Sequence, residues 1–114
     1  MIVKKLSDVP FADTSGYQNV KKQVVIGPED GSDEIVLRYF RLARGGSSPY
    51  HIHDWPHLVK IEVGTGVTVD VDGNETPVKA GDFVFVQENE KHQFRNTGNG
   101  TFEFICIVPR RGES

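Results

Sequence analysis

Cysteine is almost absent from this 114-residue sequence, which contains only Cys106. A single cysteine cannot form a disulfide bond within the chain, so a disulfide-stabilised fold is excluded and a reducing compartment is indicated. Long apolar runs are absent too, and no charged-then-apolar signal segment follows Met1. We therefore expect a cytoplasmic protein that has no membrane as a partner.

An excess of positive charge is also missing. The sequence has 13 lysine and arginine residues against 16 acidic residues, which gives a formal net charge of −3. This balance offers no electrostatic reason to expect nucleic acid as a partner. The one basic pair, Arg110 and Arg111, is interpreted as part of a solvated tail.

A sustained helical period is absent as well, and short strands separated by turns take its place. Glycine, proline, asparagine and aspartate recur between the apolar stretches. Residues 67–71 (VTVDV) show the pattern most clearly, because three valines alternate with two polar residues. The other predicted strands are 20–26, 35–43, 50–53, 58–63, 76–79, 83–86, 93–96 and 102–108. Many short strands with glycine-rich turns predict an all-β sandwich or barrel.

The length suits one domain. Residues 1–19 show no periodicity, since Pro10, Asp13 and Gly16 interrupt them. We expect this segment to be an N-terminal arm with a short strand at 2–5, placed to contact a second copy of the chain. Residues 20–114 are expected to form the barrel.

Every histidine lies in one of two short segments. His51, His53 and His57 fall within seven residues, and His92 lies in the second segment. Residues two apart on a strand point to the same face, so His51 and His53 can bind one ion with bonds of about 2.0–2.2 Å. Pro56 disfavours a regular central strand, and a bend there would bring His57 back over the same point.

A simpler explanation is that the histidines are incidental, as an isolated surface pair usually is. Four buried imidazoles without a metal would leave many ring nitrogens in need of hydrogen-bond partners. Four exposed imidazoles gathered by accident explain the pattern less economically than one metal site, which we therefore favour.

The spacing of glycine, histidine and asparagine in the two segments resembles a known pair of motifs. The first reads Gly45-x5-His51-x-His53-x3-His57-x6-Gly64, and the second reads Gly81-x5-Gln87-x-Asn89-x2-His92-x3-Asn96. Together they resemble the paired motifs of the cupin family, commonly written G-x5-H-x-H-x3/4-E-x6-G and G-x5-P-x-G-x2-H-x3-N. The sequence departs from these motifs where His57 replaces glutamate, Gln87 replaces proline and Asn89 replaces glycine.

The resemblance implies a double-stranded β-helix, or jelly-roll barrel, that binds one divalent transition metal ion. The implied ligands are His51, His53, His57 and His92, as in the small four-histidine cupins, one of which binds manganese. Imidazole suits Mn, Fe, Co, Ni, Cu and Zn alike, so the metal stays open. A three-histidine site without His57 is the alternative. Because the imidazoles must be neutral to bind, affinity should weaken as the pH falls through about 6–6.5.

Three further residues are candidates for the pocket. Phe104 and Cys106 share one face of the last predicted strand, where core packing is the ordinary explanation. In the four-histidine cupins that this sequence resembles, the matching residues help to line an apolar pocket near the metal. Arg38 either directs its guanidinium at an anionic substrate or emerges at a barrel end or an interface, and we prefer the second role.

The resemblance favours a metal-dependent oxidoreductase, similar to a dioxygenase, that acts on a small organic substrate. One alternative is an isomerase or lyase that uses the ion as a Lewis acid. This reaction would need Tyr39, Tyr50 or a carboxylate as acid or base. Another alternative is a non-catalytic module that binds metal or a small ligand. We also expect a homodimer.

Overall fold

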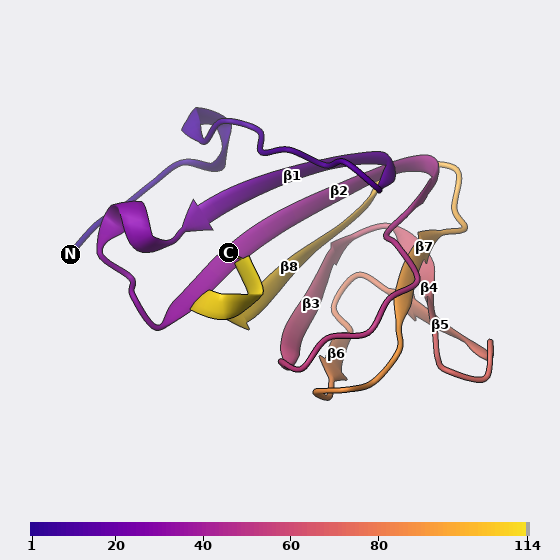
Figure 1. The fold of residues 1–114 in the computed structure, drawn as a ribbon. Coiled ribbons are helices and arrows are strands. Elements are labelled where there is room, and N and C mark those ends of the chain that lie inside the picture. Colours follow the sequence, from indigo (N-terminus) through magenta and orange to yellow (C-terminus); the bar gives the residue numbers. More distant parts are fainter. Residues whose placement is uncertain (114) are drawn as a thin grey trace.

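One curled antiparallel sheet dominates residues 1–113, which the computed structural model describes (Figure 1). Within these residues the strands are β1 Gln18–Ile26, β2 Ile35–Ser47, β3 His57–Val63, β4 Thr65–Val69, β5 Glu75–Lys79, β6 Phe83–Val86, β7 Gln93–Asn96 and β8 Phe102–Pro109. Three short 3-10 turns accompany them: η1 Leu6–Asp8, η2 Pro28–Asp30 and η3 Arg110–Glu113. The all-β, jelly-roll barrel predicted from the sequence is confirmed.

The order of the strands brings distant parts of the chain together. It runs β5-β4-β7-β2-β8-β3-β6, with β1 paired to β2. Strand β2 pairs with β1 and β8 along its first part and with β7 at Ser47. Figure 1 shows β1, β2 and β8 side by side, with the shorter strands gathered at the other side of the molecule.

The interior is apolar because side chains alternate along β2 and β8. The even-numbered residues from Val36 to Leu42 and from Phe102 to Val108 are buried. Phe104 lies near the middle, with its ring centre 5.3 Å from that of Phe40. The apolar members of this set belong to the core cluster, and a cavity lies beside the histidines.

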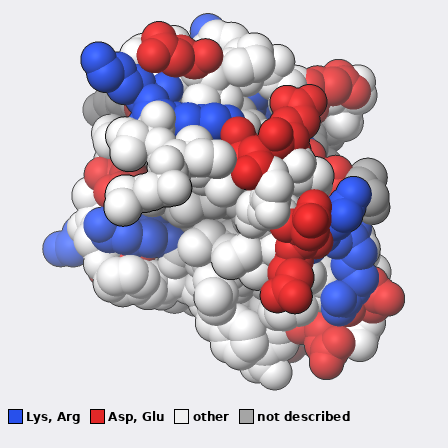
Figure 2. All heavy atoms as spheres, turned by 90° about the vertical axis from the view of Figure 1, so that its left-hand side faces the viewer, with Lys and Arg blue, Asp and Glu red and all other residues white. Residues whose placement is uncertain are grey.

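Three side chains on the outer surface of β3 and β6 are apolar and exposed. Leu58 pairs with Phe85 and is 55% exposed, while Phe83 and Phe85 are 76% and 61% exposed. A different face, shown in Figure 2, carries interspersed acidic and basic side chains around an uncharged centre. Among residues 1–113 no helix has the length and hydrophobicity needed to cross a membrane.

Two predicted strands are wrong. Residues 2–5 form no strand. In the predicted strand 50–53, only His51 makes a bridge, to His92. Pro49 and Pro56 flank this segment and cannot donate backbone hydrogen bonds, which explains why the ladder stays so short.

Arg110 and Arg111 are exposed, as predicted for a solvated segment, but they are ordered in a short turn and do not form a loose tail. Arg110 and Arg111 belong to η3, which continues directly from β8. The backbone N–H of Arg110 donates to the carbonyl of Glu34, and the Arg111 guanidinium donates to the carbonyl of Asp54. These contacts fold the segment back over the barrel, where the sequence offered no pattern to predict it.

Candidate functional site

Backbone hydrogen bonds bring the two histidine segments together. His51 and His92 exchange N–H···O bonds of 3.1 and 2.9 Å, and Asn89 donates its N–H to the carbonyl of His53 at 2.6 Å. Asn89 has φ of 62°, a left-handed conformation that asparagine tolerates better than most residues. Asparagine can therefore stand where the cupin motif has glycine without breaking the turn that positions His92.

Three imidazoles meet at one point. The potential ligand atoms of His51, His53 and His92 all lie within 4.8 Å of one another. The Nε2 atoms of His51 and His53 are 3.1 Å apart. Two ligands at right angles with bonds of about 2.1 Å would be about 3.0 Å apart, so this spacing suits a shared ion. It equally suits a direct N–H···N hydrogen bond between the two rings when no ion is bound.

The tautomer of His92 also fits a metal ligand. Its Nδ1 lies 2.7 Å from the carbonyl oxygen of Glu90, and since a carbonyl only accepts, Nδ1 must carry the hydrogen. In the neutral ring this leaves the lone pair on Nε2. Such a hydrogen bond to the far nitrogen is the usual way in which proteins orient a metal-binding histidine.

His57 is close to this group without being part of it. Its ring centre lies 4.9 Å from that of His92 and 5.2 Å from that of His53. Its Nδ1 lies 3.3 Å from the sulfur of Cys106, and its buried Nε2 has no hydrogen-bond partner within residues 1–113. If Nδ1 donates to the sulfur, Nε2 keeps a free lone pair. This orphaned atom is what a fourth metal ligand would look like.

Burial keeps the histidines neutral. Burial and the nearby charges of His53, His92 and Arg38 lower the pKa of His51 to about 4. The same causes, with burial again the largest, lower the pKa of His57 to about 3. Burial also lowers the pKa of His53 and His92. Neutral imidazoles are the form that binds metal, so the donor set fits a transition ion.

A cavity of about 140 Å³ opens beside these imidazoles. All three pocket candidates from the sequence, Arg38, Phe104 and Cys106, line it. Arg38 is 5% exposed, so the preferred prediction that it emerges at a barrel end or an interface is wrong. Its Nη2 donates to the Cys106 sulfur at 2.9 Å and lies 3.5 Å from Nδ1 of His57. Burial raises the pKa of the Cys106 thiol although Arg38 opposes the shift, so the sulfur stays protonated and can accept these bonds.

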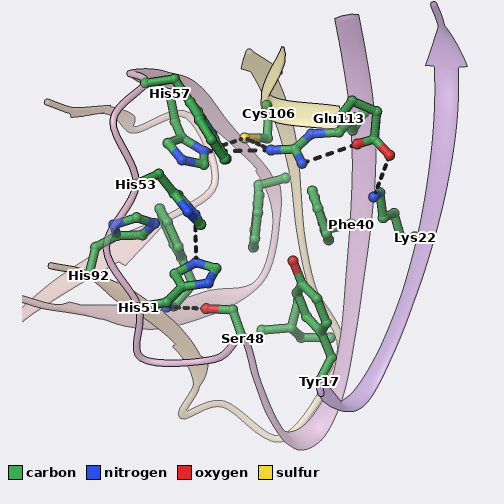
Figure 3. A pocket seen from close by; sticks show the side chains of 16 residues that line it. Tyr17, Lys22, Phe40, Ser48, His51, His53, His57, His92, Cys106 and Glu113 are labelled. Atoms are coloured by element: carbon green, nitrogen blue, oxygen red, sulfur yellow. Dashed lines mark hydrogen bonds and ion pairs between the residues drawn. The ribbon is translucent and has the colours of Figure 1, made fainter. Parts of the chain in front are cut away.

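The cavity contains polar residues that sequence reasoning missed. Tyr17, Lys22 and Glu113 line it together with the histidines. Figure 3 shows Glu113 and Lys22 at one side of the pocket and His51, His53 and His92 at the other, with Cys106 between. No spacing in the sequence relates residues 17, 22 and 113, because only the curled sheet and η3 bring them together.

The tyrosines proposed as acid or base for a non-redox reaction lie elsewhere. The hydroxyl of Tyr39 donates to Glu103 on the outer face at 2.7 Å, and the hydroxyl of Tyr50 donates to the carbonyl of Asp70. Neither residue lines the cavity. Of the groups named for that role, only a carboxylate, that of Glu113, lies in the pocket.

Fold and site together define a class: a jelly-roll barrel with a histidine cluster, a possible metal site, beside an internal pocket. The sequence model of the cupin domain family matches residues 38–108, more than half of the chain. The chain therefore belongs to the cupin family.

Individual cupins are similar to this chain over different lengths. An oxalate-binding protein of Thermotoga maritima is 36% identical over 69 residues, which are 60% of this chain and 56% of that protein. The chain spans less than two thirds of the length of the curated relatives that it matches.

Two solved structures extend the likeness to almost the whole chain. The polyketide cyclase RemF of Streptomyces resistomycificus has a TM-score of 0.88 at 28% identity, covering 96% of this chain and 79% of its own. A predicted oxalate decarboxylase of T. maritima has a TM-score of 0.83 at 26% identity, covering 96% and 99%. These relatives differ in reaction, so the shared fold alone does not select one.

Proposed function

We propose that this cupin is a metal-dependent enzyme that acts on a small organic molecule inside the barrel. One divalent transition ion would be held by His51, His53, His92 and, as the fourth ligand, His57. The observation that carries the proposal is the convergence of neutral imidazole nitrogens of His51, His53 and His92 beside a mostly apolar cavity. His57, whose buried Nε2 has no hydrogen-bond partner among residues 1–113, lines the same cavity. A buried polar atom without a partner costs free energy unless something binds it.

The ion stays open among Mn, Fe, Ni, Cu, Co and Zn, because imidazole suits each of them. Resemblance to the four-histidine, manganese-binding cupins supports manganese as the first choice. A bound ion of this kind would supply a Lewis acid and, for every one of these metals except zinc, a redox couple.

The favoured reaction is an oxidation of the dioxygenase type. Four neutral ligands and a pocket lined by Phe40, Phe94 and Phe104 suit a redox ion beside an apolar substrate. The chain's own contribution would be to bind and orient the substrate and to exclude water. No side chain is needed as a nucleophile, in keeping with the raised pKa of Cys106.

A non-redox reaction is the second candidate, as an isomerase, lyase or cyclase. The similarity to RemF, a polyketide cyclase, supports it, as does the carboxylate of Glu113 in the pocket. Burial raises the pKa of Tyr17, so its phenol would act only as a proton or hydrogen-bond donor. A non-catalytic binding module is the third candidate, supported by the similarity to an oxalate-binding protein.

Metal analysis and a reaction screen test these candidates in order. Protein purified without added metal should contain close to one transition ion per chain, and His53→Ala should contain much less. Oxygen uptake with catechols, diketones or alkenes would support the oxidoreductase, if the His53→Ala variant fails to give it. A well-folded protein without metal under all conditions of loading would exclude the metal-dependent enzyme.

We also propose a homodimer and a cytoplasmic location. The exposed side chains of Leu58, Phe83 and Phe85 support self-association, since they lie together on β3 and on β6, at one end of the sheet order. The single cysteine supports a reducing compartment.

A further inference from the structure

The cavity has a cationic end on the side away from His51, His53 and His92 (Figure 3). The two carboxylate oxygens of Glu113 each contact one cation: Oε1 lies 3.2 Å from Nη1 of Arg38, and Oε2 lies 2.7 Å from Nζ of Lys22. Figure 3 shows the Lys22 and Glu113 side chains meeting at this end, away from His92. Two cations face one carboxylate here, which leaves an excess of one positive charge.

These three charged groups are largely shielded from water. The exposed fractions of the side chains are 6% for Arg38, 13% for Lys22 and 17% for Glu113. In addition, Nε of Arg38 is buried without a hydrogen-bond partner in the described part of the chain. Arg38 therefore has binding capacity that Glu113 does not use, in a place where charge-assisted hydrogen bonds are strong.

The turn that carries Glu113 has few apolar anchors. None of the residues of η3 is buried. Besides the ion pairs of Glu113 with Lys22 and Arg38 and of Arg110 with Asp33, the contacts of the turn include the backbone bond from Arg110 to Glu34, the bond from Arg111 to Asp54, and the close approach of Gly112 to Trp55. Polar contacts of this kind exchange readily with water, which makes η3 easier to displace than the buried strands.

We propose that Arg38 and Lys22 form a carboxylate-binding subsite of the cavity, and that Glu113 occupies it until a carboxylate of the substrate displaces it. The substrate class is a small organic acid with an apolar body. This assignment of substrate rests on the proposed function, whereas the anion site itself does not need a metal.

The position of Arg38 is the reason for expecting the rest of the substrate to be apolar. Its Nη2 lies 3.5 Å from Nδ1 of His57, so a carboxylate bound to Arg38 leaves the rest of the molecule next to the histidines. Phe40 and Phe104 line that space. A cavity of about 140 Å³ is comparable to one that holds benzene, which points to an acid of the size of benzoate.

Titration of benzoate by calorimetry tests the subsite, with neutral benzamide as the matched ligand. In Glu113→Gln the internal competitor loses its charge, so benzoate should bind about tenfold more tightly than to the unaltered protein. Benzamide should not change. The control variant Glu34→Gln removes the same charge from an exposed side chain on the segment that holds η3, and should leave both affinities unchanged.

Two further variants distinguish a specific effect on benzoate binding from a general destabilisation of the fold. A Cβ at Gly112 would lie 2.8 Å from Nε1 of Trp55, so Gly112→Ala should displace η3 and tighten benzoate binding without any change of charge. Adding Lys22→Met to Glu113→Gln should weaken benzoate again. Unchanged benzoate affinity in Glu113→Gln, an equal gain for benzamide, or no saturable binding by any variant would overturn the subsite.

Each titration is run on zinc-loaded and on chelated protein. The effect of Glu113→Gln should persist after chelation, because the subsite lies on side chains and not on the ion. Benzoate binding that disappears from every variant on chelation would assign it to the metal and overturn the subsite. Absence of metal in the isolated protein would instead contradict only the proposed function.

Discussion

His57 occupies the position at which cupins commonly carry glutamate, and its two ring nitrogens face different surroundings. Nδ1 lies near Cys106 and Arg38, while Nε2 is buried and unpaired among the described residues. The hydrogen on Nδ1 decides whether Nε2 can bind an ion. If the sulfur of Cys106, 3.3 Å away, accepts that hydrogen, this thiol sets the tautomer that a fourth ligand needs.

Replacing histidines one at a time should separate a three-histidine site from a four-histidine site. In His53→Ala the metal affinity should fall by about 100-fold or more, since losing even an outer partner of a ligand costs about 10–100-fold. His57→Ala should lower it too if Nε2 is a ligand. Metal content after dialysis against a competing chelator measures both. An unchanged affinity in His57→Ala would reduce the site to His51, His53 and His92.

At the scale of the element, the turns fix where each histidine segment ends. Gly64 ends the first motif with φ of 82°, and a Cβ there would lie 2.1 Å from the carbonyl oxygen of Thr101. Asn96 ends the second motif, where its side-chain amide donates to the carbonyls of Leu42 and Gly100. Asn96 ties its motif to β2, and Gly64 lies against Thr101 just before β8, so the spacing in sequence reflects contacts in the barrel.

The Gly64→Ala substitution should destabilise the protein by about 3 kcal/mol or more, because it adds a backbone clash to left-handed strain. Gly73 offers a matched control, since its φ is 80° but nothing in the described chain lies within 4 Å of a Cβ there. Gly73→Ala should therefore cost only about 1–2 kcal/mol. Urea denaturation of both variants measures the difference, and equal losses would remove the role assigned to Thr101.

The whole molecule keeps four imidazoles neutral, and this links its stability to pH. The pKa of His51 falls to about 4 and that of His57 to about 3, so these two imidazoles stay largely unprotonated in the folded chain at pH 5, where unfolded histidine binds a proton. Unfolding then takes up protons. The expected loss of metal affinity at pH 6–6.5 consequently moves to lower pH, because it was based on an exposed histidine.

For the chelated protein we expect the free energy of unfolding to fall steadily as the pH drops from about 6.5 towards 4. Urea titrations at several pH values measure this slope. In His51→Gln the slope should be shallower, since one titrating group is lost. A free energy of unfolding that does not change between pH 6.5 and 4.5 would contradict the burial assigned to these rings.

The predicted homodimer also belongs to the whole molecule. If the outer face of β3 and β6 is the interface, Phe85→Lys should shift the protein from dimer to monomer in sedimentation experiments at micromolar concentration. Val71→Lys is the control, because Val71 is likewise apolar and 64% exposed but lies just beyond β4. A dimer that survives Phe85→Lys would place the interface elsewhere, as at the N-terminal arm.

The sequence by itself determined the strands, the turns and the histidine motifs. These features depend on local physics: alternation of side chains, glycine at positive φ, and ligands two residues apart on one face. For the same reason, eight of the predicted strands appear in the structure at or near their predicted positions. The two failures are residues 50–53, where Pro49 and Pro56 limit the ladder to one bridge, and residues 2–5, which form no strand.

Only the tertiary structure decided what surrounds the histidines. Arg38 points into the cavity from β2, and Glu113 lines it from η3. Lys22 lines it from β1, and Tyr17 lines it from the position directly before β1. Such contacts join residues up to 91 positions apart, as between Lys22 and Glu113. These contacts form because the sheet curls and because buried charged groups need partners of opposite charge. Neither cause produces a periodic pattern in the sequence.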